Sequence, residues 1–251
     1  MRFHTFGQPS SPVILLIHGM LTPWQIWGPQ IAHFCRDHYV IAAALDAHTE
    51  EEPSEFRSIE EEADTIAAYL RSQKLTTLHA VCGISLGGAV ACRLWQNSGL
   101  RIRHLVLDGA PIVRIPKAAE FVMTQNYLRI IRKSRLRDPK TIAAFKRDFL
   151  PEQYLESYLK MADIMSADSI RNAIASVSRY TVQKDGSPDT RILFIHGTKG
   201  NEAVSKKAAQ RMKQFFPQTE IVCLEGCAHC EYAIYQPEKW LDIVENRMHQ
   251  E

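Results

Sequence analysis

The stretch VCGISLGGAV, residues 81–90, places one serine between glycines inside an otherwise apolar run. Gly83, Ser85 and Gly87 form the pattern G-x-S-x-G. A tight turn from a strand into a helix uses glycine because glycine has no Cβ to clash, and such a turn needs no special function. A turn that presents the Ser85 hydroxyl for attack on a carbonyl explains the serine as well as the glycines.

Apolar runs alternate with helical stretches on both sides of this turn. Buried strands are predicted at residues 13–17, 39–45, 78–83, 102–107, 191–196 and 220–224, and helices at 59–73, 85–97, 203–214 and 237–248. The helix at 59–73 opens with the capping-box pattern S-x-x-E, which starts at Ser58. Continuous apolar strands that alternate with helices predict an α/β fold, in which a mostly parallel central sheet has helices on both faces.

Residues 116–180 break this alternation, because they contain helical periods and no strand-like run. Asp138 followed by Pro139 is typical of one helix start, and Pro151 followed by Glu152 indicates another. No repeat or low-complexity tract marks a second independent domain. We therefore expect a single domain over residues 1–251, with a helical cap over residues 112–185 inserted between two core strands.

Composition excludes several classes of function. Of the 251 residues, 45% are hydrophobic and 23% charged, as in ordinary globular proteins. The formal net charge of +2 gives no global electrostatic reason to expect a nucleic-acid partner. Polar residues interrupt any signal-peptide core near the N-terminus, and no apolar stretch approaches the roughly 18 residues of a membrane span. We expect a cytoplasmic protein.

The six cysteines do not predict a disulfide scaffold in a chain of this length. Cys82 and Cys92 are expected to be small buried hydrophobes. Cys223, Cys227 and Cys230 lie close to His229 in the pattern C-x3-C-x-H-C, but structural zinc needs four well-spaced ligands and no second ligand pair is evident. We predict no metal and no other cofactor.

A serine nucleophile needs a general base within hydrogen-bond reach. His229 follows the last predicted strand directly. The carboxyl ends of parallel strands share one edge of a sheet, so His229 can converge there with Ser85. His18 and His196 also end strands, but both stand in His-Gly pairs. Other histidines in surface-like or helical contexts are expected to be ordinary: His4, His33, His38, His48 and His249.

The sequence resembles the α/β-hydrolase superfamily over nearly its whole length. The resemblance is carried by His18-Gly19-Met20, Gly83-Ile84-Ser85-Leu86-Gly87-Gly88, Leu107-Asp108-Gly109-Ala110-Pro111, His196-Gly197 and Gly226-Cys227-Ala228-His229. It implies Ser85 as nucleophile and His229 as general base, in the order serine, acid, histidine. It also implies an oxyanion hole made by the backbone N–H groups of Met20 and Leu86. Trp24 and Trp27 resemble aromatics that line the acyl pocket or, as we favour, pack beneath it.

The third member of the triad is where the sequence departs from the family. The family often places an aspartate three residues after the glycine that corresponds to Gly197, and this chain has Gly200 there. Asp108, at the end of the preceding strand, and Glu202, two residues beyond Gly200, are both candidates. Without a catalytic role, Asp108 would cap a turn and Glu202 would lie at a solvated helix N-terminus. Asn201, or an incomplete triad, is the remaining alternative.

The predicted cap is locally basic. Residues 114–150 contain ten Lys or Arg and three Asp or Glu, although the whole chain carries only +2. A solvated helix face is the plainest interpretation. A cap that attracts an anionic substrate or an acidic carrier is a second, and a segment that rests on an anionic membrane surface is a third.

These observations lead to one principal functional hypothesis. We expect a carboxylesterase- or thioesterase-like serine hydrolase that cleaves an ester or thioester of a small or medium acyl group through an acyl-enzyme on Ser85. Acyl transfer and C–C hydrolysis would use the same residues. Dehalogenase and epoxide-hydrolase relatives need a carboxylate nucleophile, which Ser85 is not. The alternative is a catalytically weak or inactive ligand-binding or sensor protein, favoured by Gly200. The sequence does not predict an oligomeric state.

Overall fold

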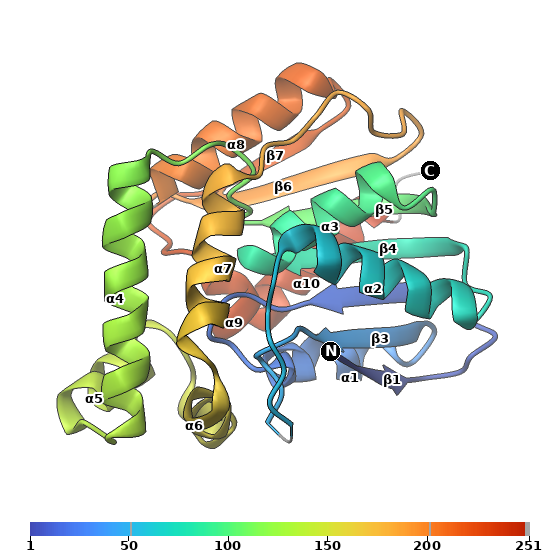
Figure 1. Cartoon of the computed structure of the whole chain (residues 1–251). Helices are drawn as coiled ribbons and strands as arrows, with labels where there is room; N and C mark the ends of the chain where they lie inside the picture. Colours follow the sequence, from blue (N-terminus) through green and yellow to red (C-terminus); the bar gives the residue numbers. More distant parts are fainter. Residues whose placement is uncertain (51, 201, 249–251) are drawn as a thin grey trace.

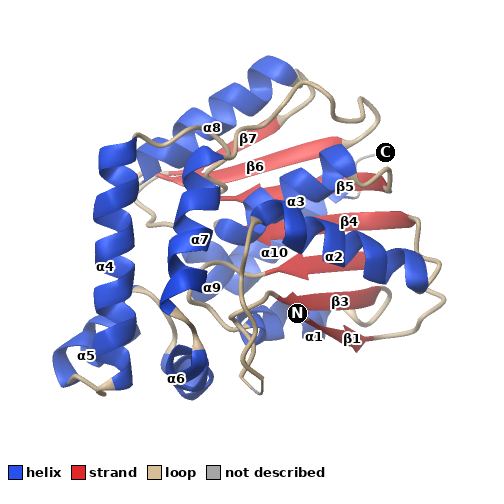
Figure 2. Ribbon diagram, viewed as in Figure 1, coloured by secondary structure: helices blue, strands red, loops and turns tan. Residues whose placement is uncertain are grey.

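A computed structural model describes residues 1–50, 52–200 and 202–248. Its sheet has the strand order β1-β3-β2-β4-β5-β6-β7 (Figures 1 and 2). The strands are β1 (Arg2–Phe6), β2 (Val13–Ile17), β3 (Tyr39–Ala44), β4 (Thr77–Ile84), β5 (Arg101–Asp108), β6 (Arg191–Gly197) and β7 (Glu220–Leu224). All neighbouring pairs are parallel except β1 with β3. The expected mostly parallel α/β fold is confirmed.

Strand β1 is the element of the sheet that the sequence did not predict. It pairs antiparallel with β3, Arg2 opposite Ala44 and Phe6 opposite Val40. Its residues are only half-buried or exposed, whereas every residue of β2 is buried. The residues of β1 include Arg2, His4 and Thr5, so they form no continuous apolar run, whereas all five residues of β2 are apolar. The search for apolar runs therefore found β2 and missed β1.

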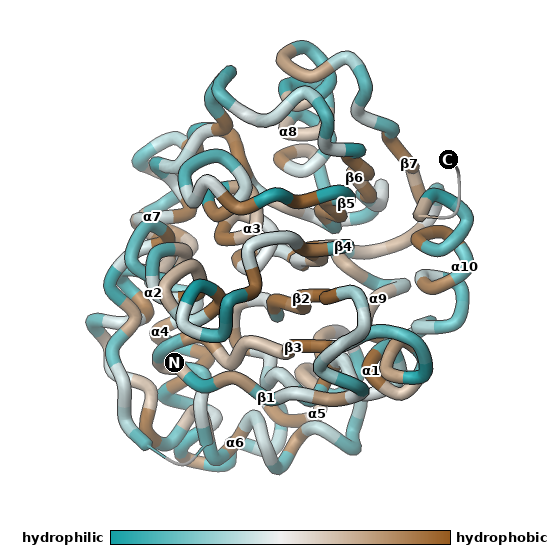
Figure 3. Tube along the Cα trace, turned by 90° about the vertical axis from the view of Figure 1, so that its right-hand side faces the viewer, coloured by the Kyte–Doolittle hydropathy of each residue, from teal (hydrophilic) through white to brown (hydrophobic). Residues whose placement is uncertain are grey.

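Helices cover both faces of the sheet (Figures 1 and 3). One face carries α2 (Ile59–Ser72) and α3 (Leu86–Asn97), and the other carries α1 (Gly28–Phe34), α9 (Glu231–Tyr235) and α10 (Pro237–Met248). Helix α8 (Glu202–Phe215) packs along β6 and β7. The hydropathy colours of Figure 3 show apolar strands between these layers. The capping prediction at Ser58 is confirmed, because its side chain accepts a hydrogen bond from the Glu61 amide at 3.1 Å.

Four α-helices lie in the chain between β5 and β6, and we call them the inserted helices. They are α4 (Lys117–Arg135), α5 (Pro139–Asp148), α6 (Leu155–Ile164) and α7 (Ala167–Arg179). They stand beside the edge at which the parallel strands end (Figure 1). Asp138 caps α5 as predicted, by accepting a hydrogen bond from the Thr141 amide at 2.9 Å. The start predicted at Pro151 is instead a 3₁₀ turn, Glu152–Tyr154, which leads directly into α6.

Within the described ranges, no helix combines the length and the apolar character that crossing a bilayer requires. The longest described helix, α4, has Glu120 in its first turn and three basic side chains in its last turn.

Candidate active site

Ser85 forms the turn between β4 and α3. Its φ of 50° and ψ of −118° lie in a backbone region that a side chain makes unfavourable, and such strain is typical of functional turns. The Ser85 amide donates to the Asp108 carbonyl at 2.8 Å, and the Ser85 carbonyl accepts from the Gly88 amide at 3.0 Å. The turn is thereby fixed to the end of β5 on one side and to α3 on the other. The side chain itself is only partly buried.

The flanking glycines are required by close backbone packing. A Cβ at Gly83 would lie 2.3 Å from the Gly87 carbonyl oxygen, and a Cβ at Gly87 would lie 2.3 Å from the carbonyl oxygens of Ile17 and His18. No side chain fits at either distance. The G-x-S-x-G pattern therefore reflects a turn pressed against the end of β2.

The segment after β2 lies against this turn. A Cβ at Gly19 would be 3.3 Å from the Cβ of Ser85. The neighbouring Met20 and Leu86 are both buried. Neither backbone N–H donates a hydrogen bond to any residue in the described part of the chain. Two N–H groups therefore remain available to an acceptor in the segments on either side of the Ser85 turn.

His229 reaches the same edge from the loop after β7. A Cβ at Gly109 would lie 2.6 Å from the Cε1 atom of His229, so the imidazole ring lies directly on Gly109. The preceding residue, Asp108, holds the Ser85 amide. Ser85 and His229, which are 144 positions apart in the chain, thus contact consecutive residues at the end of β5. The side chain of His229 is 41% exposed.

Glu202, one of the two acid candidates, is the hydrogen-bond partner of His229. The Oε1 atom of Glu202 lies 2.5 Å from His229 Nδ1, and Oε2 accepts from the Gly197 amide at 2.7 Å. The Ser205 hydroxyl also donates to Oε1, at 3.3 Å. Burial by itself would raise the pKa of Glu202. The hydrogen bond and charge of His229, together with the Gly197 amide, lower the pKa by more than burial raises it, so the net pKa lies below the usual value. Glu202 is therefore a carboxylate.

Asp108, the other candidate, is in a different environment. Its side chain is 2% exposed, and Oδ2 has no hydrogen-bond partner among the described residues. Burial raises the pKa of Asp108 to about 7; the nearby His229 opposes this rise and the charge of Glu202 adds to it. The hydrogen bond from His229 goes to Glu202. Asp108 contributes its backbone carbonyl, which holds Ser85 and the Cys230 thiol.

Gly200 explains why the carboxylate is displaced from its usual place. Its φ is +67°, in the left-handed region that favours glycine, and nothing lies within 4 Å of the position of a Cβ. A side chain at that position would be strained and would point into open space. The turn then brings Glu202, the first residue of α8, to His229. The other alternative, Asn201, lies outside the described residues.

The Cys223, Cys227 and Cys230 side chains diverge. Cys223 is exposed, the Cys227 thiol faces the Glu225 carbonyl at 3.9 Å, and the Cys230 thiol donates to the Asp108 carbonyl at 3.4 Å. Across residues 1–50, 52–200 and 202–248, no three side chains of the ligating types are placed to hold a metal ion together. Cys82 and Cys92 are buried, as predicted.

The expectation of a surface-like context for His48 was wrong. His48 is 1% exposed, and its Nε2 atom accepts a hydrogen bond from the Leu21 amide at 3.2 Å. The contact spans 27 positions and joins a side chain to a backbone group, so no motif in the sequence could reveal it. Trp27 is buried and packs on Trp240 with ring centroids 5.4 Å apart, in agreement with the packing role favoured above.

The basic surplus of residues 114–150 divides into paired and solvent-facing groups. Arg137 makes two hydrogen bonds to Asp163, both at 2.7 Å, and Lys146 pairs with Glu152. Others of the ten side chains face solvent: Arg114, Lys117, Arg129, Arg132 and Lys140. Positive charge therefore remains on the outer surface of the inserted helices.

Comparison with known proteins yields consistent matches. The model of the alpha/beta hydrolase family matches residues 14–243. A pimeloyl-acyl-carrier-protein methyl ester esterase from Nitrosomonas europaea is 21% identical, with 92% of this chain and 94% of that protein aligned. Among solved structures, a thermophilic esterase from Thermogutta terrifontis has a TM-score of 0.75 at 18% identity, covering 99% of this chain and 94% of the other. The enol-lactonase from Burkholderia xenovorans has a TM-score of 0.72 at 17% identity, covering 98% and 95%.

Proposed function

Since the chain belongs to the alpha/beta hydrolase family, we propose that it is a serine hydrolase that cleaves an ester or thioester through an acyl-enzyme on Ser85. The observation that carries the proposal is the 2.5 Å hydrogen bond between Glu202 and His229, at the edge where Ser85 forms a strained turn. A buried carboxylate that binds Nδ1 leaves the other imidazole nitrogen, Nε2, to accept a proton from a serine.

The first half of the reaction transfers the acyl group to the enzyme. The Ser85 hydroxyl attacks the carbonyl carbon while its proton passes to His229 Nε2. The carbonyl oxygen becomes an oxyanion, which accepts hydrogen bonds from the amides of Met20 and Leu86. When the intermediate collapses, the bond to the alcohol or thiol breaks and the leaving group takes the proton from His229. Glu202 stabilises the imidazolium throughout this half.

The second half returns the enzyme to its starting state. A water molecule gives one proton to His229 Nε2 as its oxygen attacks the acyl carbon. The same two amides stabilise the new oxyanion. Collapse breaks the bond to Ser85 Oγ, which recovers the proton from His229, and the carboxylic acid is released. No oxidant, reductant or further reactant is consumed.

The inserted helices support a proposal on the substrate. We assign them to the cap, over residues 112–185, which covers the site and selects the acyl group. Their solvent-facing positive charge favours an acyl group that carries a negative charge or is attached to an acidic carrier. The name of the Nitrosomonas relative, a methyl ester esterase of a carrier-bound acyl group, agrees with this choice.

The sensor alternative loses the observation that favoured it. It rested on the missing side chain at Gly200, and Glu202 now provides a carboxylate to His229 from two residues further on. The alternative would regain support only from a folded protein that binds acyl esters without turnover.

A panel of p-nitrophenyl esters with acyl chains from two to ten carbons, together with matched thioesters, tests the proposal. We expect turnover with a preference within the panel, and a fall in kcat of about 10⁴-fold or more for Ser85→Ala because the nucleophile is lost. Turnover that survives in S85A, or a folded protein that hydrolyses no member of the panel, would overturn the proposal.

A further inference from the structure

The segment that carries the Met20 amide is held at both of its neighbours by buried histidines. Leu21 has a φ of 57°, unusual for a leucine, and its N–H donates to His48 Nε2 at 3.2 Å. On the other side, the Gly19 carbonyl accepts a hydrogen bond from His18 Nδ1 at 2.9 Å and another from the Thr22 hydroxyl at 2.9 Å. These three contacts involve no group that reacts in the proposed chemistry.

Peptide planarity makes these contacts decide where the Met20 N–H points. The Gly19 carbonyl and the Met20 N–H belong to one planar trans peptide and point in opposite directions. The next peptide along the chain ends in the Leu21 N–H, which His48 holds. With the peptide on each side of the Met20 Cα held, the Met20 N–H has one direction available.

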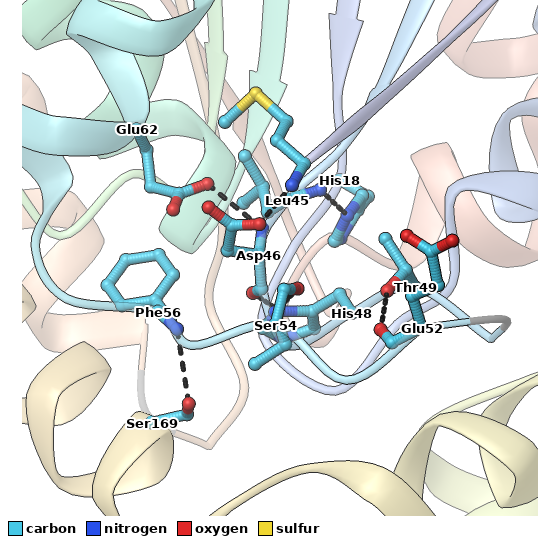
Figure 4. A network of polar contacts seen from close by, with 12 residues as sticks. His18, Leu45, Asp46, His48, Thr49, Glu52, Ser54, Phe56, Glu62 and Ser169 are labelled. Carbon is cyan, nitrogen blue, oxygen red and sulfur yellow. Dashed lines mark hydrogen bonds and ion pairs between the residues drawn. The ribbon is translucent and has the colours of Figure 1, made fainter.

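His48 is itself rigidly placed in the loop after β3 (Figure 4). Its Nδ1 atom donates to the Asp46 carbonyl at 3.0 Å, and the adjacent Ala47 amide donates to the Ser54 hydroxyl at 2.9 Å. His18 is tied to the same loop, because its Nε2 atom accepts from the Leu45 amide at 3.0 Å. The two imidazole rings lie 5.1 Å apart between centroids.

We propose that His48 is a positioning residue for the oxyanion hole, acting by accepting the Leu21 N–H and so fixing the Met20 amide toward Ser85. The inference rests on the proposed function, because it needs an oxyanion at that place. It assigns a role to a residue that touches neither the substrate nor the reacting atoms. The acceptor must be an unprotonated Nε2, and burial, the main cause, lowers the pKa of His48 to about 4, so this form predominates near neutral pH.

The test compares two replacements of similar length. In His48→Gln the amide oxygen can stand near the position of Nε2 and accept from Leu21, whereas His48→Met fills similar space without a strong acceptor. Both variants and the parent are assayed with a neutral p-nitrophenyl ester, and kcat is expressed per active site titrated from the acylation burst. Partial unfolding lowers the number of titrated sites but not this kcat. His33→Asn, on the half-exposed side chain that pairs with Glu245, controls for loss of a histidine elsewhere.

We expect H48M to lose about 10- to 100-fold in kcat with KM within about threefold of the parent, because one oxyanion donor is misaligned. H48Q should recover to within about fivefold of the parent, and H33N should equal the parent. If H48M does not fold, His48→Asn, too short to reach Leu21, replaces it in the comparison. Equal kcat for H48M and H48Q, whether high or low, would overturn the inference. Its failure is distinct from failure of the proposed function, in which the parent itself would show no turnover dependent on Ser85.

Discussion

The edge of the sheet that carries Ser85 and the inserted helices differ in how completely their side chains are buried. At the edge, Glu202 is 2% exposed and each of its carboxylate oxygens has a hydrogen-bond partner. On α4, by contrast, Phe121 is 65% exposed and Val122 is 56% exposed, and Leu136, which follows the helix, is 73% exposed. Chemistry at an ester carbonyl demands one geometry, which tight packing maintains. Selection of an acyl group demands a surface, which can differ between relatives while the chemistry stays the same.

Charge follows the same division. Glu202, the hydrogen-bond partner of His229, and Asp108 are both buried, while several basic groups of the inserted helices face solvent. A hollow of about 500 Å³ between α4 and α5 has Arg129, Lys133 and Lys140 among its lining residues, together with apolar side chains. We therefore propose that the sheet edge sets the rate and that the inserted helices set the substrate preference.

The largest effect is expected from replacing Glu202, with the same kind of replacement at Asp108 as the comparison. Glu202→Gln removes the charge that orients and stabilises His229, and should lower kcat about 10²- to 10⁴-fold with little change in KM. Asp108→Asn removes a carboxyl without a hydrogen bond to the imidazole, and should change kcat less than about threefold at pH 8. Steady-state kinetics of both variants with one ester decides the matter. A reversed ranking would make Asp108 the acid.

Stability of the sheet edge should depend on pH through two histidines. Burial, with His48 as a second cause, lowers the pKa of His18 to about 3, and burial lowers that of His48 to about 4, against 6.5 when exposed. The unfolded chain therefore binds protons that the folded chain does not, so the stabilisation is complete above pH 6.5 and is lost as pH falls toward 4. Two buried acids act in the opposite direction over the same window, because burial raises the pKa of Asp108 to about 7 and that of Glu62 to about 8. We therefore expect the histidine contribution to appear in urea unfolding as a difference between the parent and a His48 variant.

A variant separates this effect from the general effect of acid. His48→Gln cannot take up the proton, so when the pH is lowered from 7.5 to 4.5 the parent should lose more free energy of unfolding, or gain less, than H48Q. Identical slopes for H48Q and the parent would show that His48 is not protonated on unfolding in this range.

The smallest expected effect belongs to the inserted helices. Reversing two solvent-facing charges, by Arg129→Glu with Lys140→Glu, should raise KM about 3- to 10-fold for an ester whose acyl group ends in a carboxylate. KM for the uncharged ester of equal length should change less than twofold, and the difference should shrink at about 0.5 M salt because exposed charges are screened. The control is Lys74→Glu with Lys184→Glu, two exposed lysines that precede β4 and β6 at the opposite edge of the sheet. Equal effects from the two pairs would remove the helices from substrate selection.

The sequence predicted the parts of the fold that depend on continuous apolar runs. Strand β2 occupies residues 13–17 as predicted, because every side chain in it is buried. Strand β1 was missed because Arg2, His4 and Thr5 interrupt its apolar residues. The acid remained undecided because Asp108 and Glu202 both follow strands that end at the same edge of the sheet, and the sequence does not show which carboxylate His229 Nδ1 contacts. His48 was misassigned for a similar reason, since its partner is a backbone amide of a distant loop.

The most direct test of the central claim is covalent labelling of the native protein with a fluorophosphonate, followed by intact mass and peptide mapping. The geometry of Ser85, His229 and Glu202 predicts one adduct per chain, located on Ser85 and absent from S85A. A folded protein that takes up no label, or an adduct that maps to another residue, would contradict the assignment of this edge as a hydrolytic site.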